Sequence, residues 1–188
     1  MKPALPGRRG GAPNILLGIA RVACGRADGI ARFGTTREAF LASLAPLLAF
    51  PLVGGALLLA GGAGLAGAAQ LLATICALLA PPVLSFEMAR LWGRRPAWLR
   101  FATALNWCQW VIPVVLLGIL APVLSVMLEE RTAVAVTVGA VGCYALWLHW
   151  FLARHALDLS RLRAAALVLI VNFGTALLVL GPALLAGS

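Results

Sequence analysis

Residues 164–185 read AAALVLIVNFGTALLVLGPALL, a stretch near the C-terminal end of the sequence that contains no charged residue. The hydrocarbon core of a bilayer is about 30 Å thick, and an α-helix of about 20 apolar residues is long enough to cross it. This stretch therefore predicts a membrane-spanning helix. Four further stretches of the same kind precede it, at residues 39–60, 65–86, 102–128 and 133–152. The sequence predicts an all-α fold, a polytopic transmembrane helix bundle of five spans.

The composition of the chain leads to the same conclusion. Of its 188 residues, 62% are hydrophobic and 11% are charged, and the mean hydropathy is +0.99. Soluble domains carry about a quarter charged residues, and one core buries only about two-thirds of the surface of an unfolded chain of this size. These values exclude a soluble enzyme and an ordinary nucleic-acid-binding domain, although a net charge of +9 at first suggests a nucleic-acid partner.

The basic residues predict the orientation of the spans. Cytoplasmic segments of membrane proteins carry an excess of Lys and Arg. Of the fifteen such residues, all except Arg131 lie in the segments that directly precede the first, third and fifth spans. They are Lys2, Arg8, Arg9, Arg21, Arg26, Arg32, Arg37, Arg90, Arg94, Arg95, Arg100, Arg154, Arg161 and Arg163. We expect a cytoplasmic N-terminus and an external C-terminus. Because the preference for Arg over Lys is typical of GC-rich bacterial genes, we expect the bacterial inner membrane.

The N-terminal region has a different character from the spans. We expect a disordered basic tail at 1–12, an amphipathic cytoplasmic segment at 13–34 and the five-span domain at 35–188. Between Asn14 and Phe33, arginines and aliphatic residues are placed as in one amphipathic helix lying on the cytoplasmic leaflet. A loosely ordered basic tail is the alternative. A cleaved signal is not expected, because the apolar run 15–23 is short and Arg21 interrupts it. Thr35–Glu38 form a capping box that predicts the start of the first span.

No residue pattern indicates a catalytic, cofactor-binding or metal-binding site, and no enzyme activity is expected. The four cysteines occur singly, without the paired spacing of a zinc site. His149 and His155 are six residues apart, so they do not share a helical face as metal ligands four residues apart would. Residues 62–67 match the GxGxxG dinucleotide-binding motif, but they follow a predicted membrane helix and not a strand. Close packing of small residues explains that motif better.

Neutral polar residues inside the predicted spans form a candidate intramembrane cluster. Its members are Asn106, Gln109 and Asn172. Charged residues inside a membrane mark transport pathways, and the middle of each predicted span contains none. Interhelical hydrogen bonds, worth about 0.6 kcal/mol each, explain such polar residues in most membrane proteins. A polar path for a solute is the alternative.

Tryptophan and arginine gather at the predicted cytoplasmic ends of the spans. Tryptophan favours the headgroup region of a bilayer, and clustered arginines attract anionic lipids. A candidate surface for anionic lipids of the cytoplasmic leaflet, or for a membrane-protein partner, follows from this placement. Its residues are Arg90, Trp92, Arg94, Arg95, Arg100, Trp107, Trp110, Trp147 and Trp150.

Two groups of short motifs in the chain resemble the Yip domain (Ypt-interacting-protein type). The first group is ARLWG at 89–93, WLRF at 98–101, and NW at 106–107 leading to IP at 112–113. The second group is LW at 146–147 and ALDLSR at 156–161. The resemblance covers about residues 35 to 185 and implies five spans with a cytoplasmic N-terminus. It also implies a non-enzymatic role in membrane organisation and partner binding. The acidic-Tyr-Gly-Pro signature of eukaryotic trafficking members is absent, so a GTPase partner is not implied.

Three functional hypotheses remain open at this point. The first is a non-enzymatic membrane protein that binds lipids or partners through its basic, Trp-rich cytoplasmic side. The second is a small transporter or channel-like subunit, formed by a homo-oligomer around the polar cluster. The third is an accessory subunit of a larger membrane complex. No cofactor and no nucleic-acid partner is expected for any of them.

Overall fold

The computed structural model describes residues 14–186, and within them every side chain except those of residues 110–112 and 180–186. The described part of the chain consists of helices and connecting turns, with no strand. In chain order the elements are α1 (Ile15–Ala23), the 3-10 helix η1 (Ala27–Arg32), α2 (Arg37–Ala60), α3 (Gly64–Leu91), α4 (Arg95–Met127), α5 (Glu130–Ala156) and α6 (Arg161–Ala186). The tail predicted to be disordered at 1–12 lies outside the described residues.

Five helices, α2 to α6, are long and apolar enough to cross a membrane. This confirms an all-helical, multi-pass membrane fold. The helices extend beyond the apolar runs that predicted them: α3 continues past Phe86 to Leu91, and α4 begins at Arg95 and not at residue 102. Apolar runs mark only the part of a helix suited to lipid, whereas backbone hydrogen bonding continues into charged sequence. An ion pair between Glu87 and Arg90, three residues apart, stabilises the last turn of α3.

The start of α2 differs by one residue from the predicted capping box. Thr36, and not Thr35, is the N-cap, and its hydroxyl accepts a hydrogen bond of 3.2 Å from the backbone N–H of Ala39. Such a cap satisfies one of the N–H groups that the first turn of a helix leaves unpaired. The helix consequently begins at Arg37.

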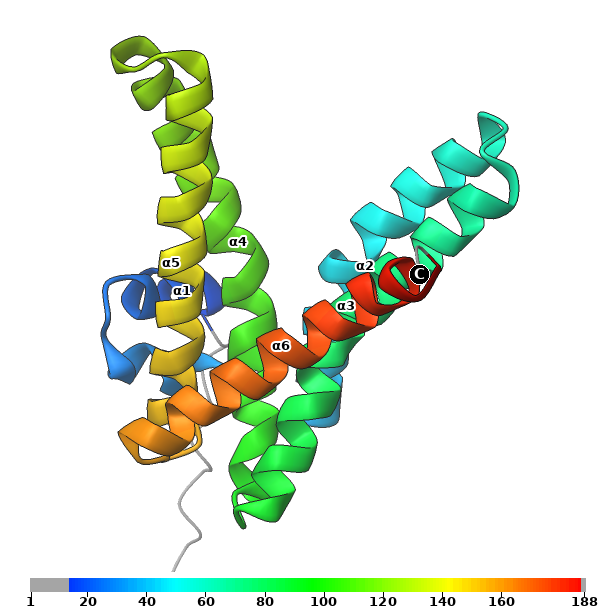
Figure 1. Ribbon diagram of the computed structural model, residues 1–188. Coiled ribbons are helices and arrows are strands. Elements are labelled where there is room, and N and C mark those ends of the chain that lie inside the picture. Colours follow the sequence, from blue (N-terminus) through cyan, green and yellow to red (C-terminus); the bar gives the residue numbers. More distant parts are fainter. Residues whose placement is uncertain (1–13, 187–188) are drawn as a thin grey trace, which may run out of the picture.

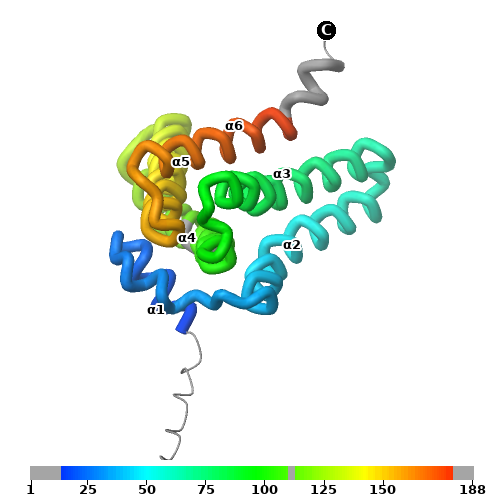
Figure 2. The backbone as a smooth tube through the Cα atoms, turned by 90° about the horizontal axis from the view of Figure 1, so that it is seen from below, coloured from blue at the N-terminus to red at the C-terminus, as the bar shows by residue number. Residues whose placement is uncertain are grey.

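The membrane helices form two hairpins and one crossing helix (Figure 1). Helices α2 and α3 form the first hairpin, and α4 and α5 form the second; the two diverge from a shared base. Helix α6 starts beside α5 and crosses to lie along α3, as Figure 2 also shows. We call the base, with the α3–α4 loop (92–94) and the α5–α6 loop (157–160), the arginine-rich end. The opposite end, with the turns at 61–63 and 128–129, is the turn end.

The hydrophobic core is concentrated at the arginine-rich end. Phe101 of α4, Leu152 of α5 and Leu167 of α6 are fully buried there and belong to one cluster. Towards the turn end the hairpins have little interior, and large apolar side chains such as Leu65 and Val126 are more than 80% exposed. Lipid tails are as apolar as these side chains, so this exposure suits helices that face a bilayer.

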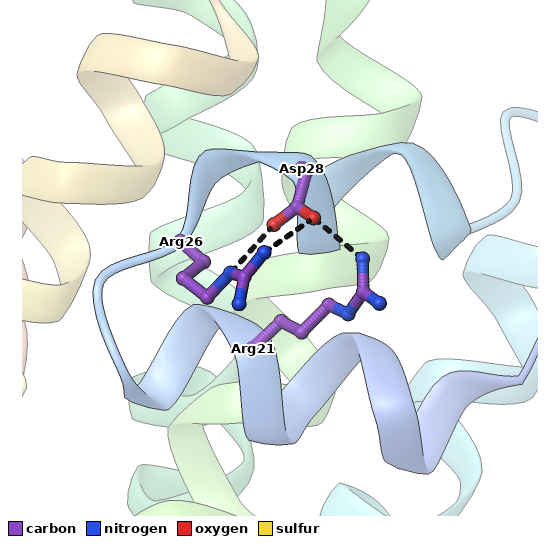
Figure 3. Close-up of polar contacts among 3 residues, drawn as sticks. All are labelled: Arg21, Arg26 and Asp28. Atoms are coloured by element: carbon purple, nitrogen blue, oxygen red, sulfur yellow. Dashed lines mark hydrogen bonds and ion pairs between the residues drawn. The ribbon is translucent and has the colours of Figure 1, made fainter.

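The segment between Asn14 and Phe33 is not one continuous helix. Helix α1 ends at Ala23, the chain reverses at Gly25, whose φ is +71°, and η1 follows. Residues that carry a side chain rarely adopt a positive φ, whereas glycine does so without steric cost. Across this reversal, Asp28 forms ion pairs with both Arg21 and Arg26 (Figure 3).

The folded segment packs on the rest of the protein. Ile19 and Val22 of α1 and Ile30 of η1 are buried in the core cluster. The hydroxyl of Tyr144 on α5 donates a hydrogen bond of 2.6 Å to the carbonyl of Ala23. The exposed side of α1 includes Leu16, which is 75% exposed. The segment is therefore anchored to α4 and α5 by side chains from both of its short helices.

Candidate functional site

Two of the candidate arginines are committed to ion pairs at the arginine-rich end. Arg90 lies 2.7 Å from the Glu87 carboxylate within α3. Arg94 lies 3.3 Å from Asp158, which follows the end of α5, so this pair joins the two loops. Asp158 adopts a φ of +50°, a conformation that Asp tolerates better than most residues. Only the second pair links two parts of the base, whereas the first stabilises α3 alone.

The other two candidate arginines are exposed and have no carboxylate partner in the described part of the chain. The Arg95 guanidinium carbon lies 5.7 Å from the centre of the Phe86 ring, a cation–π contact with α3. Arg100 lies one turn further along α4 and lines a small pocket with Thr35 and Ala156. Exposed Arg161 and Arg163 begin α6 at the same end. Together these residues present a positive surface that the acidic residues of this end do not neutralise.

Most of the candidate tryptophans connect elements of the fold. Trp92 and Trp107 are half-buried against the core cluster. Trp147 stacks on Phe151 with 5.4 Å between ring centres, and its ring faces Gly25 across the α1–η1 turn. The indole N–H of Trp150 donates a hydrogen bond of 3.2 Å to the carbonyl of Arg161. The side chain of Trp110 lies outside the described residues.

Asn106 and Ser43 form a buried hydrogen bond between α4 and α2. The Asn106 amide donates to the Ser43 hydroxyl over 3.0 Å, and that hydroxyl donates to the carbonyl of Phe40 over 2.6 Å. Both side chains are almost completely buried. The side-chain amide nitrogen of Asn106 is therefore used in joining two helices.

Gln109 and Asn172 line a pocket between α4, α5 and α6 together with His149. The pocket has a volume of about 290 Å³. The Asn172 amide nitrogen donates to the carbonyl of Val168 over 2.7 Å and lies 3.4 Å from Nδ1 of His149. The structure thus brings two of the three residues of the predicted polar cluster to one pocket, and it adds a histidine from a third helix.

His149 is the most unusual polar residue of this pocket. Its side chain is buried and stacks on Phe101 of α4, with 6.1 Å between ring centres. Its Nε2 atom has no hydrogen-bond partner among the described residues. A buried polar atom without a partner is costly, and such atoms in native proteins often have a ligand or a water as partner. Nε2 itself is covered by neighbouring atoms, so it does not by itself offer a binding group to the pocket.

Two contacts important for this region had no signal in the sequence. His149 was not included in the predicted cluster, because only the relative depth and rotation of α5 and α6 bring it to Asn172. Trp98 was not included in the predicted surface, yet its indole N–H donates 3.1 Å to Ser85 and ties α4 to α3. Cross-helix neighbours of this kind depend on tertiary packing and not on local spacing.

The described residues contain no group of three or more His, Cys, Asp and Glu side chains that could hold a metal ion. Within 14–186 all four cysteines are free thiols, and only Cys108 is buried. None of the protein-family models, curated proteins and solved structures that were compared with the chain matches it. The resemblance to the Yip domain stays a prediction.

Proposed function

We propose that the protein is a non-enzymatic, multi-pass protein of the bacterial inner membrane that binds anionic lipids of the cytoplasmic leaflet and so helps to organise the membrane. The observation that carries the proposal is the exposed positive surface of Arg95, Arg100, Arg161 and Arg163 at one end of the molecule. Each basic residue near an anionic membrane surface contributes about 1 kcal/mol of attraction. In this proposal the acidic headgroups supply the negative charge that the protein itself lacks there.

The distribution of charge along the chain supports the proposed orientation. With the arginine-rich end in the cytoplasm, the N-terminal segment is cytoplasmic and the C-terminus is external, in accordance with the positive-inside rule. The turn end has Glu129, Glu130 and Arg131, with no excess of positive charge. A role in membrane organisation also agrees with what the Yip resemblance implies.

The composition of the lipids that surround the protein in its membrane provides a test of this proposal. The full-length protein is extracted from its membrane with an amphipathic polymer that retains neighbouring lipids, and the anionic fraction of those lipids is compared with that of the bulk membrane. We expect an anionic excess that disappears when Arg95, Arg100, Arg161 and Arg163 are all changed to Gln. Arg131→Gln at the turn end is the control and should keep the excess. An unchanged excess in the fourfold variant would contradict the proposal. A co-extracted protein in fixed stoichiometry would instead support the accessory-subunit hypothesis.

The pocket at Gln109, His149 and Asn172 favours a second candidate, a small transporter or channel-like subunit. A pocket between three membrane helices, lined mainly by apolar side chains but also by the amides of Gln109 and Asn172, is a place where a small polar solute could bind. Shrinkage of proteoliposomes in glycerol or urea measures this activity. A flux that Asn172→Leu abolishes and Thr74→Val, outside the pocket, preserves would support transport. A flux equal to that of protein-free liposomes would remove this candidate for both solutes.

A further inference from the structure

A groove between α2, α3 and α4 opens at the arginine-rich end. Its volume is about 440 Å³. Leu79, Val83 and Phe86 are spaced four and three residues apart, which places them on one face of α3. This face spans about 10 Å along the helix axis. The side chains that line the groove include those of Phe40, Leu44, Leu79, Val83, Phe86 and Trp98.

The end of the groove nearest the loops is fixed by aromatic contacts. The ring of Trp98 lies 5.2 Å from that of Phe40 and 5.0 Å from that of Phe86, measured between ring centres. The only polar atom of the lining side chains named above is the Trp98 indole nitrogen, and it already donates to Ser85. The groove is consequently preformed and apolar, and its lining side chains offer no free hydrogen-bond donor.

A positive group contacts the wall of the groove at this end. The Arg95 guanidinium lies over the ring of Phe86, which is itself part of the groove wall. Its neighbours Arg90 and Arg94 are paired with Glu87 and Asp158, whereas Arg95 is exposed and has no carboxylate partner among residues 14–186. The first turn of α4 also contains no acidic residue, so the partial positive charge of the helix N-terminus adds to that of Arg95.

We infer that this groove binds one anionic phospholipid, with an acyl chain along the face of α3 and the phosphate on Arg95. The inference rests on the proposed function, because both place anionic lipid at the arginine-rich end, and it assigns that lipid a defined site. An apolar groove alone does not select a ligand in a bilayer, since lipid tails are as apolar as leucine. Selection comes from the guanidinium, which binds phosphate oxygens through two parallel hydrogen bonds.

Native mass spectrometry of the full-length protein tests the site. The protein is released from nanodiscs containing equal amounts of phosphatidylglycerol and phosphatidylcholine with the same acyl chains, and retained lipids are counted per chain. For the wild type we expect one phosphatidylglycerol retained at activation energies that remove the other lipids. Arg95→Gln should lower the ratio of phosphatidylglycerol-bound to lipid-free protein about fivefold, as expected for one basic contact near the membrane surface. Val83→Trp should abolish this occupancy by filling the groove.

Two matched variants separate the site from general effects. Arg154→Gln removes the same charge from the same end, at a residue of the last turn of α5 that lies outside both the groove and the proposed lipid-binding surface, and should leave the occupancy unchanged. Val53→Trp places the same bulk at a position outside the groove that is as exposed as Val83, 61% in both cases, and it should also have no effect. Equal occupancy in Arg95→Gln and Arg154→Gln, or an undiminished occupancy in Val83→Trp, would overturn the assignment. These results would leave the proposed function intact, because the wild type would still prefer anionic lipid. A wild type that retains the two lipids equally would overturn both.

Discussion

The hydrogen bond between Asn106 and Ser43 shows how a single polar pair can set the packing of two membrane helices. Its two side chains lie 63 positions apart in the sequence and are both almost completely buried. A polar group in hydrocarbon without a partner is unfavourable. Of the ways in which α2 and α4 could pack, those that align these two residues are therefore preferred.

A double-mutant cycle measures this preference. We expect Asn106→Ala and Ser43→Ala each to lower the free energy of unfolding, and we expect the double variant to lose less than the sum of the two. The coupling energy should be about 0.6 kcal/mol and at most about 1.7 kcal/mol, the range found for interhelical hydrogen bonds in membranes. Unfolding of the reconstituted protein by a denaturing detergent provides the measurement.

Ser125→Ala is the control for this cycle. The Ser125 hydroxyl donates only to the carbonyl of Pro122 in its own helix, so combining Ser125→Ala with Asn106→Ala should give strictly additive losses. Additivity for the Asn106 and Ser43 pair as well would mean that the bond contributes nothing to the packing of α2 on α4.

At the scale of elements, the α1–η1 segment depends on contacts with α5 for its position. The Tyr144 hydroxyl holds the end of α1 through the Ala23 carbonyl. We expect Tyr144→Phe to speed up amide hydrogen exchange in residues 15–32 by about twofold to tenfold, as the loss of one hydrogen bond worth about 0.5–1.5 kcal/mol requires. Exchange in α2 to α6 should stay as in the wild type, and hydrogen-exchange mass spectrometry resolves the two regions.

Trp150→Phe is the matched variant for this prediction. It removes another hydrogen bond that an aromatic side chain of α5 donates to a backbone carbonyl, in this case that of Arg161. Amide exchange in residues 15–32 should therefore stay unaltered. Equal protection of that segment in Tyr144→Phe and in the wild type would show that the buried side chains of α1 and η1 are sufficient to hold it.

The elements differ in how far the sequence alone predicts them. Membrane helices follow from long apolar runs, a local property, and all five were predicted. The interruption at Gly25 was not predicted, because the pattern of charged and apolar residues continues on both sides of the turn. The helix ends near Leu91 and Arg95 were also missed, since charged residues end an apolar run without ending a helix. For the candidate site, the sequence predicted which polar residues lie inside the spans. The hydrogen-bond partners of Asn106 and Asn172 on other helices could be identified only from the tertiary structure.

At the scale of the whole molecule, the placement of the four loops predicts a pattern of chemical accessibility. Ala63 and Leu128 lie at the turn end, and Leu91 and Leu162 lie at the arginine-rich end. We expect single cysteines at the first two positions, in a background without native cysteine, to react with a membrane-impermeant maleimide in intact cells. Cysteines at the last two positions should react only after permeabilisation, because positive charge remains in the cytoplasm.

Each possible departure from this pattern has a distinct meaning. The reverse pattern would preserve the five spans and contradict the predicted orientation. Different reactivity of Ala63→Cys and Leu128→Cys, or of Leu91→Cys and Leu162→Cys, would contradict the arrangement of spans itself. Reaction of all four cysteines in intact cells would place both ends outside and contradict the arrangement in the same way.

The concentration of the core at one end has a mechanical consequence. Helix α4 has 33 residues, which correspond to a length of about 50 Å, and most of its buried contacts lie in its first half. A rotation of a hairpin by about 5° at the base would move its far turn by about 4 Å over that length. Stiffness is therefore unequal along the membrane normal: the base resists deformation, while the separation of the two turns responds to the lateral pressure of the bilayer around them.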